Sequence, residues 1–196
     1  MTHVRSKRLN LGERNSPMNL RRIKQVYVVS GESNSGKTTI LHALCDYLHT
    51  IAVEVDDYPL NSSDQCCKAK LPDGRVVGVG TAGDTAGLVI ENFLYFSEGT
   101  GTSVRESGCD IVFIALTKNR SRHNRRYKPN CSSAEIAVYD VIFPAFMQAF
   151  TVPTNVVATK RYSQHYNNYQ QRRDDDNKLV LQRLKNFIEI EESSNV

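Results

Sequence analysis

The chain has 196 residues, a hydrophobic share of 40% and a formal net charge of +4, which fits one domain with a real core and at most two small ones. No apolar run approaches a membrane span and the N-terminus lacks the apolar core of a signal peptide, so we expect no membrane association. Five cysteines without a C-x-x-C pair exclude a disulfide framework and a zinc ribbon, and favour inert thiols in a reducing cytoplasm.

The N-terminal segment differs from the rest of the chain in charge. We expect residues 1–22 to form a flexible basic arm and residues 23–192 to form one domain. Basic residues dominate 1–24, where Glu13 is the only acid. Such an arm can contact nucleic acid, but we favour a solvated tail over a nucleic-acid partner, because basic termini are often simply disordered.

A strand is predicted over residues 25–30 and a helix over 39–48. The strand is β-branched and aromatic, and the helix places Ile40, Leu41, Leu44 and Leu48 on one face. Between them residues 31–38 read G-E-S-N-S-G-K-T, which is a complete G-x-x-x-x-G-K-T phosphate-binding loop. Strand, glycine-rich loop and helix together make this motif strong evidence for a nucleoside di- or triphosphate ligand.

Each position of the loop has a physical reason. Gly31 permits the turn out of the strand, and Gly36 lets the backbone approach the phosphates. Lys37 is a mobile charge for the β- and γ-phosphates, and the Thr38 hydroxyl suits Mg²⁺. The predicted nucleotide-binding residues are Gly31, Glu32, Ser33, Asn34, Ser35, Gly36, Lys37, Thr38 and Thr39.

The next segment suggests a strand followed by a hairpin. Residues 51–55 alternate as in a strand, and Asp56-Asp57-Tyr58-Pro59 suggests a turn. Pro72-Asp73-Gly74 is a strong turn signal that can join 65–70 and 75–80 in a hairpin. A buried strand over 76–79 then ends in Gly80-Thr81-Ala82-Gly83-Asp84.

Helices and strands continue to alternate in the second half. We expect a helix over about 85–97, a polar insertion over 97–108 and an apolar strand over 109–116. A basic loop over 118–131 follows, and the capping-box spacing from Ser132 to Glu135 predicts a helix that Pro144 kinks or ends. The remaining elements are a short strand over 155–158, a loop or ragged helix start over 162–176, and an amphipathic helix over 177–190.

This alternation predicts an α/β fold, a three-layer sandwich around a mostly parallel central sheet. The phosphate site is expected at the carboxyl ends of the strands.

On these residues the chain resembles the P-loop NTPase superfamily over roughly 24–190, with the loop at 31–38 as the specific match. Gly80-Thr81-Ala82-Gly83-Asp84 is similar to the D-T-A-G-Q stretch of small GTPases, but Gly80 replaces the strand-end aspartate that helps to hold Mg²⁺ there. The segment from Gly80 to Leu116 looks more like a group of small, largely uncharacterised bacterial P-loop proteins, through Thr81–Asp84, Glu91-Asn92 and Cys109-Asp110-Ile111. The resemblance implies the P-loop fold and nucleotide binding but no substrate.

The N-K-x-D motif that reads guanine in GTPases has no counterpart here. Its nearest strings, Thr117–Arg120 and Ala158–Arg161, lack the aspartate. Because a site without that polar partner loses much of its discrimination, we favour ATP over GTP as the nucleotide, with Mg²⁺ as its metal.

Two residues are the first candidates for catalysis. Lys37 supplies charge neutralisation, and Asp84 is the best acid for the metal or the attacking water, although it can instead cap the helix that follows. Thr38 and Asp84 are therefore the predicted metal residues. Asp56 and Asp57 are a second choice for Mg²⁺, although we prefer to interpret these two residues as part of a solvated turn. An arginine finger in the basic loop is also open, among Arg120, Arg122, Arg125 and Arg126.

Three functions fit this pattern. The first is Mg²⁺-dependent triphosphate hydrolysis, expected to be regulatory and leaving room for a protein partner. The second is a small-molecule or nucleotide kinase with a basic lid. The third is a nucleotide-binding switch without useful turnover. The loss of the strand-end aspartate favours either this switch or slow hydrolysis.

Overall fold

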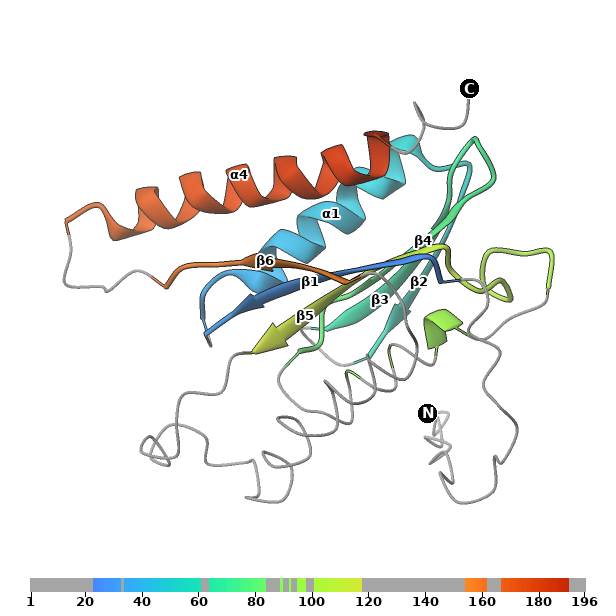
Figure 1. The fold of residues 1–196 in the computed structure, drawn as a ribbon, viewed down its shortest axis with the longest axis horizontal. Helices are drawn as coiled ribbons and strands as arrows, with labels where there is room; N and C mark the ends of the chain where they lie inside the picture. Colours follow the sequence, from blue (N-terminus) through green and yellow to red (C-terminus); the bar gives the residue numbers. More distant parts are fainter. Residues whose placement is uncertain are drawn as a thin grey trace, which may run out of the picture.

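In the computed structural model the described residues are 23–32, 34–60, 64–83, 89, 92, 95–97, 101–117, 154–161 and 167–190. Within them lies a six-stranded sheet in the order β2-β3-β4-β5-β1-β6, shown with its helices in Figure 1. The strands are β1 (Gln25–Gly31), β2 (Glu54–Pro59), β3 (Gln65–Lys70), β4 (Val76–Gly80), β5 (Ile111–Thr117) and β6 (Thr154–Ala158). The helices described over their whole length are α1 (Lys37–Ile51) and α4 (Tyr169–Ile190).

The sheet is mixed, and of these six strands only β3 runs against the others. β1 pairs parallel with β5 and β6, and β4 pairs parallel with β5. β3 pairs antiparallel with both β2 and β4. The chain is therefore α/β, as predicted.

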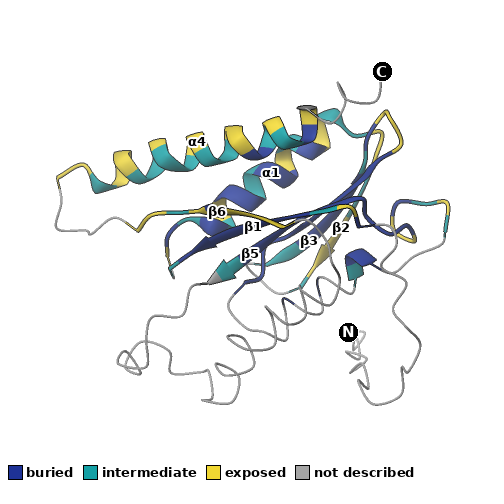
Figure 2. Cartoon of the chain, in the orientation of Figure 1, coloured by how far each residue is buried: buried dark blue, intermediate teal, exposed yellow. Residues whose placement is uncertain are grey.

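Both faces of the sheet are covered, because alternate residues of the central strands enter two separate cores. Tyr27 and Val29 belong to the core on the helix side, and Val26 and Val28 belong to the core on the other side. Figure 2 shows the central strands β1 and β5 buried, whereas β6 and β2 at the two edges are more exposed. Burial on both faces explains why β1 is a continuous apolar run rather than an alternating one.

Helices α1 and α4 lie on the same face of the sheet (Figure 1). α1 buries Ile40, Leu41, Leu44 and Leu48, which is the predicted face. α4 docks through Phe187, whose ring stacks on Tyr27 with 4.4 Å between centroids. Tyr27 in turn stacks on Phe113 of β5, so α4 is held over the centre of the sheet.

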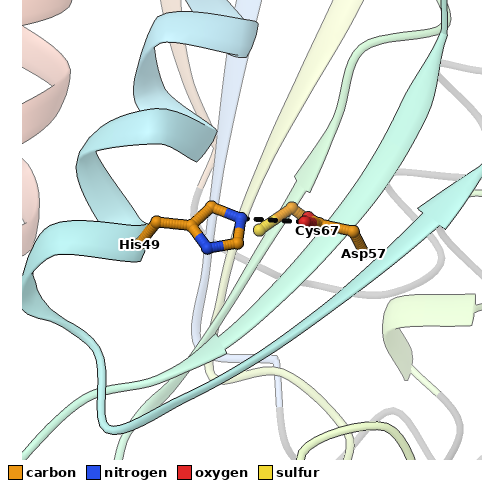
Figure 3. Close-up of side chains that lie close together, drawn as sticks. All are labelled: His49, Asp57 and Cys67. Atoms are coloured by element: carbon orange, nitrogen blue, oxygen red, sulfur yellow. Dashed lines mark hydrogen bonds and ion pairs between the residues drawn. The ribbon is translucent and has the colours of Figure 1, made fainter.

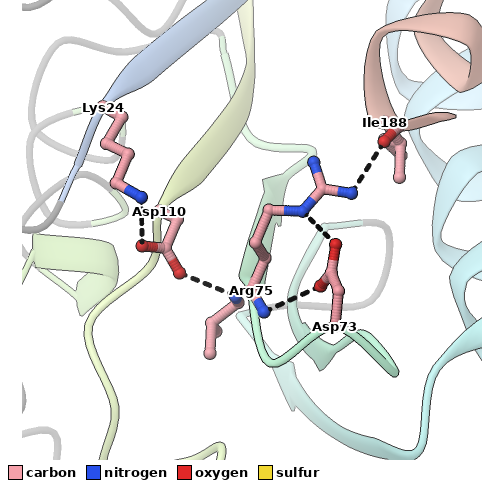
Figure 4. Close-up of polar contacts among 6 residues, drawn as sticks. Lys24, Asp73, Arg75, Asp110 and Ile188 are labelled. Atoms are coloured by element: carbon pink, nitrogen blue, oxygen red, sulfur yellow. Dashed lines mark hydrogen bonds and ion pairs between the residues drawn. The ribbon is translucent and has the colours of Figure 1, made fainter. Parts of the chain in front are cut away.

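The predicted hairpin over 65–80 is confirmed. β3 and β4 pair from Cys66↔Gly80 to Lys70↔Val76, and Gly74 takes the left-handed conformation in the turn, with φ of +88°. Arg75, just after the turn, donates from Nη2 to the Ile188 carbonyl oxygen at 3.0 Å, and its Nε bonds the Asp73 carboxylate (Figure 4). The hairpin thereby holds the C-terminal end of α4.

The segment after α1 differs from the prediction. α1 continues through Ile51, and the expected turn at residues 56–59 is part of β2. An edge strand accommodates charges and a proline, because one side of its backbone needs no ladder partner. Asp56 accepts a hydrogen bond from Tyr95 Oη at 3.0 Å, and Asp57 contacts His49 Nε2 at 2.8 Å.

The other predicted elements have mixed outcomes. β6 and the apolar strand β5 are present, and helical residues are described at 89, 92 and 95–97 within the predicted 85–97 helix. α4 starts at Tyr169, eight residues before the predicted 177. The basic arm 1–22, the basic loop and the capping-box helix lie outside the described residues.

Candidate functional site

The loop between β1 and α1 combines two left-handed residues with an open helix N-terminus. Asn34 has φ of +61° and Gly36 has φ of +90°. Gly36 is the N-cap of α1 and brings no side chain to cap it. Ile40 N donates to Gly36 O at 2.9 Å, so the helical ladder begins directly behind the loop. Backbone N–H groups at such an N-terminus, with the positive end of the helix dipole, favour an anion.

Lys37 lies inside this loop rather than in solvent. The residue is only 6% exposed, and its Nζ donates to the Glu32 carbonyl oxygen at 2.8 Å. Ser35 N also donates to Glu32 O, at 3.3 Å, so this carbonyl closes the loop from two sides. The structure thus brings a positive charge and the α1 N-terminus to one point.

The other predicted nucleotide-binding residues differ in exposure. Ser35 is fully buried, Thr38 at the first turn of α1 is partly exposed, and Asn34 and Thr39 are exposed. Ser33 lies outside the described residues. Thr38 is thus a partly exposed residue directly after Lys37, and a threonine hydroxyl is a hard oxygen ligand of the kind that Mg²⁺ requires.

Thr159, which directly follows β6, packs against the loop and was missed as a site residue. Its Oγ1 shares a hydrogen bond with Ser35 Oγ at 2.7 Å, and its N donates to Ser30 O at 2.8 Å. A methyl group at Gly31 would lie 2.0 Å from Thr159 Oγ1, which gives Gly31 a packing reason beyond its turn. The signal that the sequence offered for Thr159 was its position directly after a predicted strand. The carboxyl ends of parallel strands meet at the same edge of the sheet, so a residue there can reach the loop after β1.

Asn177 of α4 also reaches the loop. A methyl group at Gly36 would lie 2.5 Å from Asn177 Nδ2 and 2.8 Å from its Oδ1. Beside it, Asp176 is ion-paired to Lys160 at 3.9 Å, which links α4 to the segment after β6. The sequence gives no signal for this contact, because the polar run around Asn177 has no apolar period to place it.

The turn after β4 is held in place by other segments and lies two strands away from the loop that follows β1. Asn92 Nδ2 donates to Ala82 O at 3.3 Å, and a methyl group at Gly83 would lie 2.6 Å from Ala115 of β5. β5 stands between β4 and β1, so the ends of β4 and β1 are two strand spacings apart, about 10 Å. Asp84 itself lies outside the described residues, and its predicted roles remain predictions.

Asp56 and Asp57 do not meet the loop, and this second choice for Mg²⁺ is corrected. They lie on β2, at the opposite side of the sheet from β6, and β2 is four strand spacings from β1, roughly 19 Å. Asp110, the other acid of the resemblance, has a structural role at the start of β5. Its Oδ2 accepts from Val76 N at 2.9 Å, and its Oδ1 is 3.7 Å from Lys24 Nζ (Figure 4).

The four described cysteines are buried and form no disulfide: Cys45, Cys66, Cys67 and Cys109. The arginines of the basic loop lie outside the described part of the chain. In that described part, no helix has the length and apolar character needed to cross a membrane. Comparison of the chain with protein-family models, curated proteins and solved structures gives no match.

Proposed function

We propose that this chain adopts the P-loop NTPase fold and binds a nucleoside triphosphate with Mg²⁺, with ATP favoured, and hydrolyses it in a regulatory cycle. The observation that carries the proposal is the position of Lys37. Its ammonium group lies buried within a loop of two left-handed residues at the start of α1. A cation and convergent backbone N–H groups at one point are what a polyphosphate requires.

The roles follow from the chemistry of each group. Lys37 would exchange the Glu32 carbonyl for phosphate oxygens, which are stronger acceptors because they are charged. Thr38 would hold Mg²⁺ with its hydroxyl, and Asp84 would bind the metal or orient the attacking water. The metal supplies charge neutralisation on the phosphates; the loop supplies binding and orientation.

A switch without useful turnover is the second candidate, and the contact between Asn177 and Gly36 favours it. Phosphates bound in the loop would approach the backbone at Gly36, where even an added methyl group would meet the Asn177 amide of α4 at 2.5 Å. A ligand in the loop therefore has a direct means of moving Asn177 and the helix that carries it. Replacement of the strand-end aspartate by Gly80 also points to slow chemistry.

The first prediction is that Lys37→Ala abolishes or greatly weakens binding of Mg·ATP while the far-ultraviolet circular dichroism stays unchanged. Calorimetric titration measures it. Lys24→Ala is the matched control, because Lys24 is exposed at the opposite end of β1 and should bind like the wild type. Unchanged affinity in Lys37→Ala would remove the central claim.

A thermal-shift screen of ATP, GTP and other nucleotides, with and without Mg²⁺, tests base and metal together. A ligand at a hundred times its Kd stabilises the fold by about 2.7 kcal/mol, which is easily measured. We expect the largest shift with Mg·ATP. A larger shift with Mg·GTP would reverse the base preference and leave the loop assignment intact.

A further inference from the structure

Three side chains with metal-binding chemistry meet at the far end of α1, away from the phosphate loop. They are His49, Asp57 and Cys67, drawn together in Figure 3. Their ligand atoms all lie within 4.8 Å of one another, and His49 Nε2 is 2.8 Å from Asp57 Oδ2. The proposed nucleotide chemistry uses none of the three.

The fold itself brings these residues together. Asp57 and Cys67 are direct partners across the antiparallel pair of β2 and β3, so their side chains stand on the same face of the sheet. His49 comes from the last turn of α1, which packs on that face. Two of the three groups are therefore fixed by the sheet ladder and the third by a docked helix.

The donor set is one imidazole nitrogen, one carboxylate oxygen and one sulfur. Zinc binds all three types, at about 2.0–2.3 Å, which places tetrahedral ligand atoms about 3.4–3.6 Å apart. His49 Nε2 and Asp57 Oδ2 are 2.8 Å apart, and no two of the three ligand atoms are more than 4.8 Å apart, so all three lie near that spacing. Small side-chain rotations suffice to bring the ligand atoms to it.

Access to the cluster is from one side only. The His49 and Asp57 side chains are 47% and 41% exposed, whereas Cys67 is fully buried beneath them. The ligand atoms of the two exposed side chains lie within 4.8 Å of the Cys67 sulfur, so an ion that they bind from solvent lies close to the thiol. A water molecule on the exposed side can complete the four ligands.

We propose that His49, Asp57 and Cys67 form a binding site for a zinc-like divalent ion that ties the end of α1 to β2 and β3. On binding, a metal–sulfur bond forms, the S–H bond of Cys67 breaks, and its proton passes to solvent. The site lies twelve residues along α1 from Lys37, about 18 Å, so the inference does not depend on the proposed nucleotide function.

The experiment uses the full chain, reduced and free of nucleotide. Zn²⁺ is titrated by calorimetry, and Co²⁺ replaces it as a spectroscopic probe whose sulfur charge-transfer and visible bands report thiolate ligation and four-coordination. We expect one ion per chain. Since loss of a residue that only hydrogen-bonds to a metal ligand costs about 10–100-fold in affinity, loss of a ligand itself in His49→Gln or Asp57→Asn should weaken binding by about a hundredfold or more.

The neighbouring residues on the opposite face provide matched controls. Asp56 contacts Tyr95, and Cys66 donates to Asn92 Oδ1 at 3.1 Å, so Asp56→Asn and Cys66→Ser should bind Zn²⁺ like the wild type. Cys67→Ser should remove the cobalt–sulfur band. If that variant does not fold, the exposed His49 and Asp57 variants still decide the matter.

Two results would overturn the site. One is Zn²⁺ affinity unchanged in both His49→Gln and Asp57→Asn, which means adventitious binding elsewhere. The other is a cobalt spectrum without a sulfur band. Lys37→Ala should bind Zn²⁺ normally, so failure of the nucleotide proposal and failure of the metal proposal give different results.

Discussion

At the scale of single residues, two glycines with nearly the same backbone conformation face different surroundings. Gly36 and Gly74 have φ of +90° and +88°. A methyl group at Gly74 would meet nothing within 4 Å, whereas one at Gly36 would meet the Asn177 amide at 2.5 Å. The pair therefore separates the cost of the left-handed conformation from the cost of crowding.

We expect Gly74→Ala to lower the free energy of unfolding by about 1 kcal/mol, for the backbone conformation alone. Gly36→Ala should cost about 1 kcal/mol more, because Asn177 must rotate away. Adding Asn177→Ala to Gly36→Ala should remove that extra cost. Urea unfolding of the wild type, Gly36→Ala, Asn177→Ala and the double variant measures the cycle, and a coupling of zero would mean that Asn177 does not press on the loop.

At the scale of elements, the sequence predicts best where turn chemistry and apolar period agree. The strand–loop–helix at residues 25–51 and the hairpin around Pro72-Asp73-Gly74 need only local signals. The strand expected over 51–55 is β2 at 54–59, placed too early because its second half is charged and ends in a proline, and Asp56 and Asp57 gain their partners from other segments.

The candidate site shows the same division. The loop residues are recognisable from their motif. Thr159, in contrast, lies 124 positions after its partner Ser35, and Asn177 lies 141 positions after its neighbour Gly36. Only the parallel order of β1 and β6 and the docking of α4 bring them there. Such contacts depend on tertiary packing, for which a single sequence carries no local signal.

Arg75 provides a prediction at this scale, because it joins the hairpin to the end of α4. The Arg75 side chain is 9% exposed, and its target is the carbonyl of Ile188 in the last turn of a helix with no basic residue there. A cation at that end offsets the helix dipole and satisfies a terminal carbonyl.

Arg75→Met keeps the apolar stem but should lower the free energy of unfolding by about 1.5–3 kcal/mol, the range for a hydrogen bond that involves a charged group. Hydrogen exchange in the last turn of α4 should accelerate. Arg105→Met is the control, since Arg105 is exposed and should change stability by less than about 0.5 kcal/mol. Equal stability of the two variants would mean that the Arg75 hydrogen bond does not help to hold α4 on the sheet.

At the scale of the whole molecule, two side chains that lose a proton in alkali, Cys66 and Tyr95, set how the free energy of unfolding changes with pH. Burial, followed by the neighbouring Cys45 and Cys109, raises the pKa of the Cys66 thiol from 9.0 to about 12. Burial and then the Asp56 carboxylate also raise the pKa of the Tyr95 hydroxyl above its ordinary value of 10.0. Both groups hold their protons in the folded state at a pH where the unfolded chain has released them.

The sign follows from proton linkage. The contribution of Cys66 is complete below pH 9 and is lost as the pH rises towards 12, because only the unfolded state gains by ionising there. One such group changes the free energy of unfolding by about −1.4 kcal/mol per pH unit. Cys66→Ala should therefore be less stable than the wild type at pH 8, yet lose stability less steeply between pH 9 and 11.

Urea unfolding at several pH values, with reductant and chelator present, measures both slopes. Val112→Ala is the matched control, because it removes buried apolar volume from the same core as Cys66 without removing a thiol. If Cys66→Ala kept the wild-type slope, the Cys66 thiol would have the same pKa in the folded and unfolded states and the assignment would be wrong. A shallower slope in Cys66→Ala than in Val112→Ala would locate the alkaline sensitivity at the Cys66 thiol of β3.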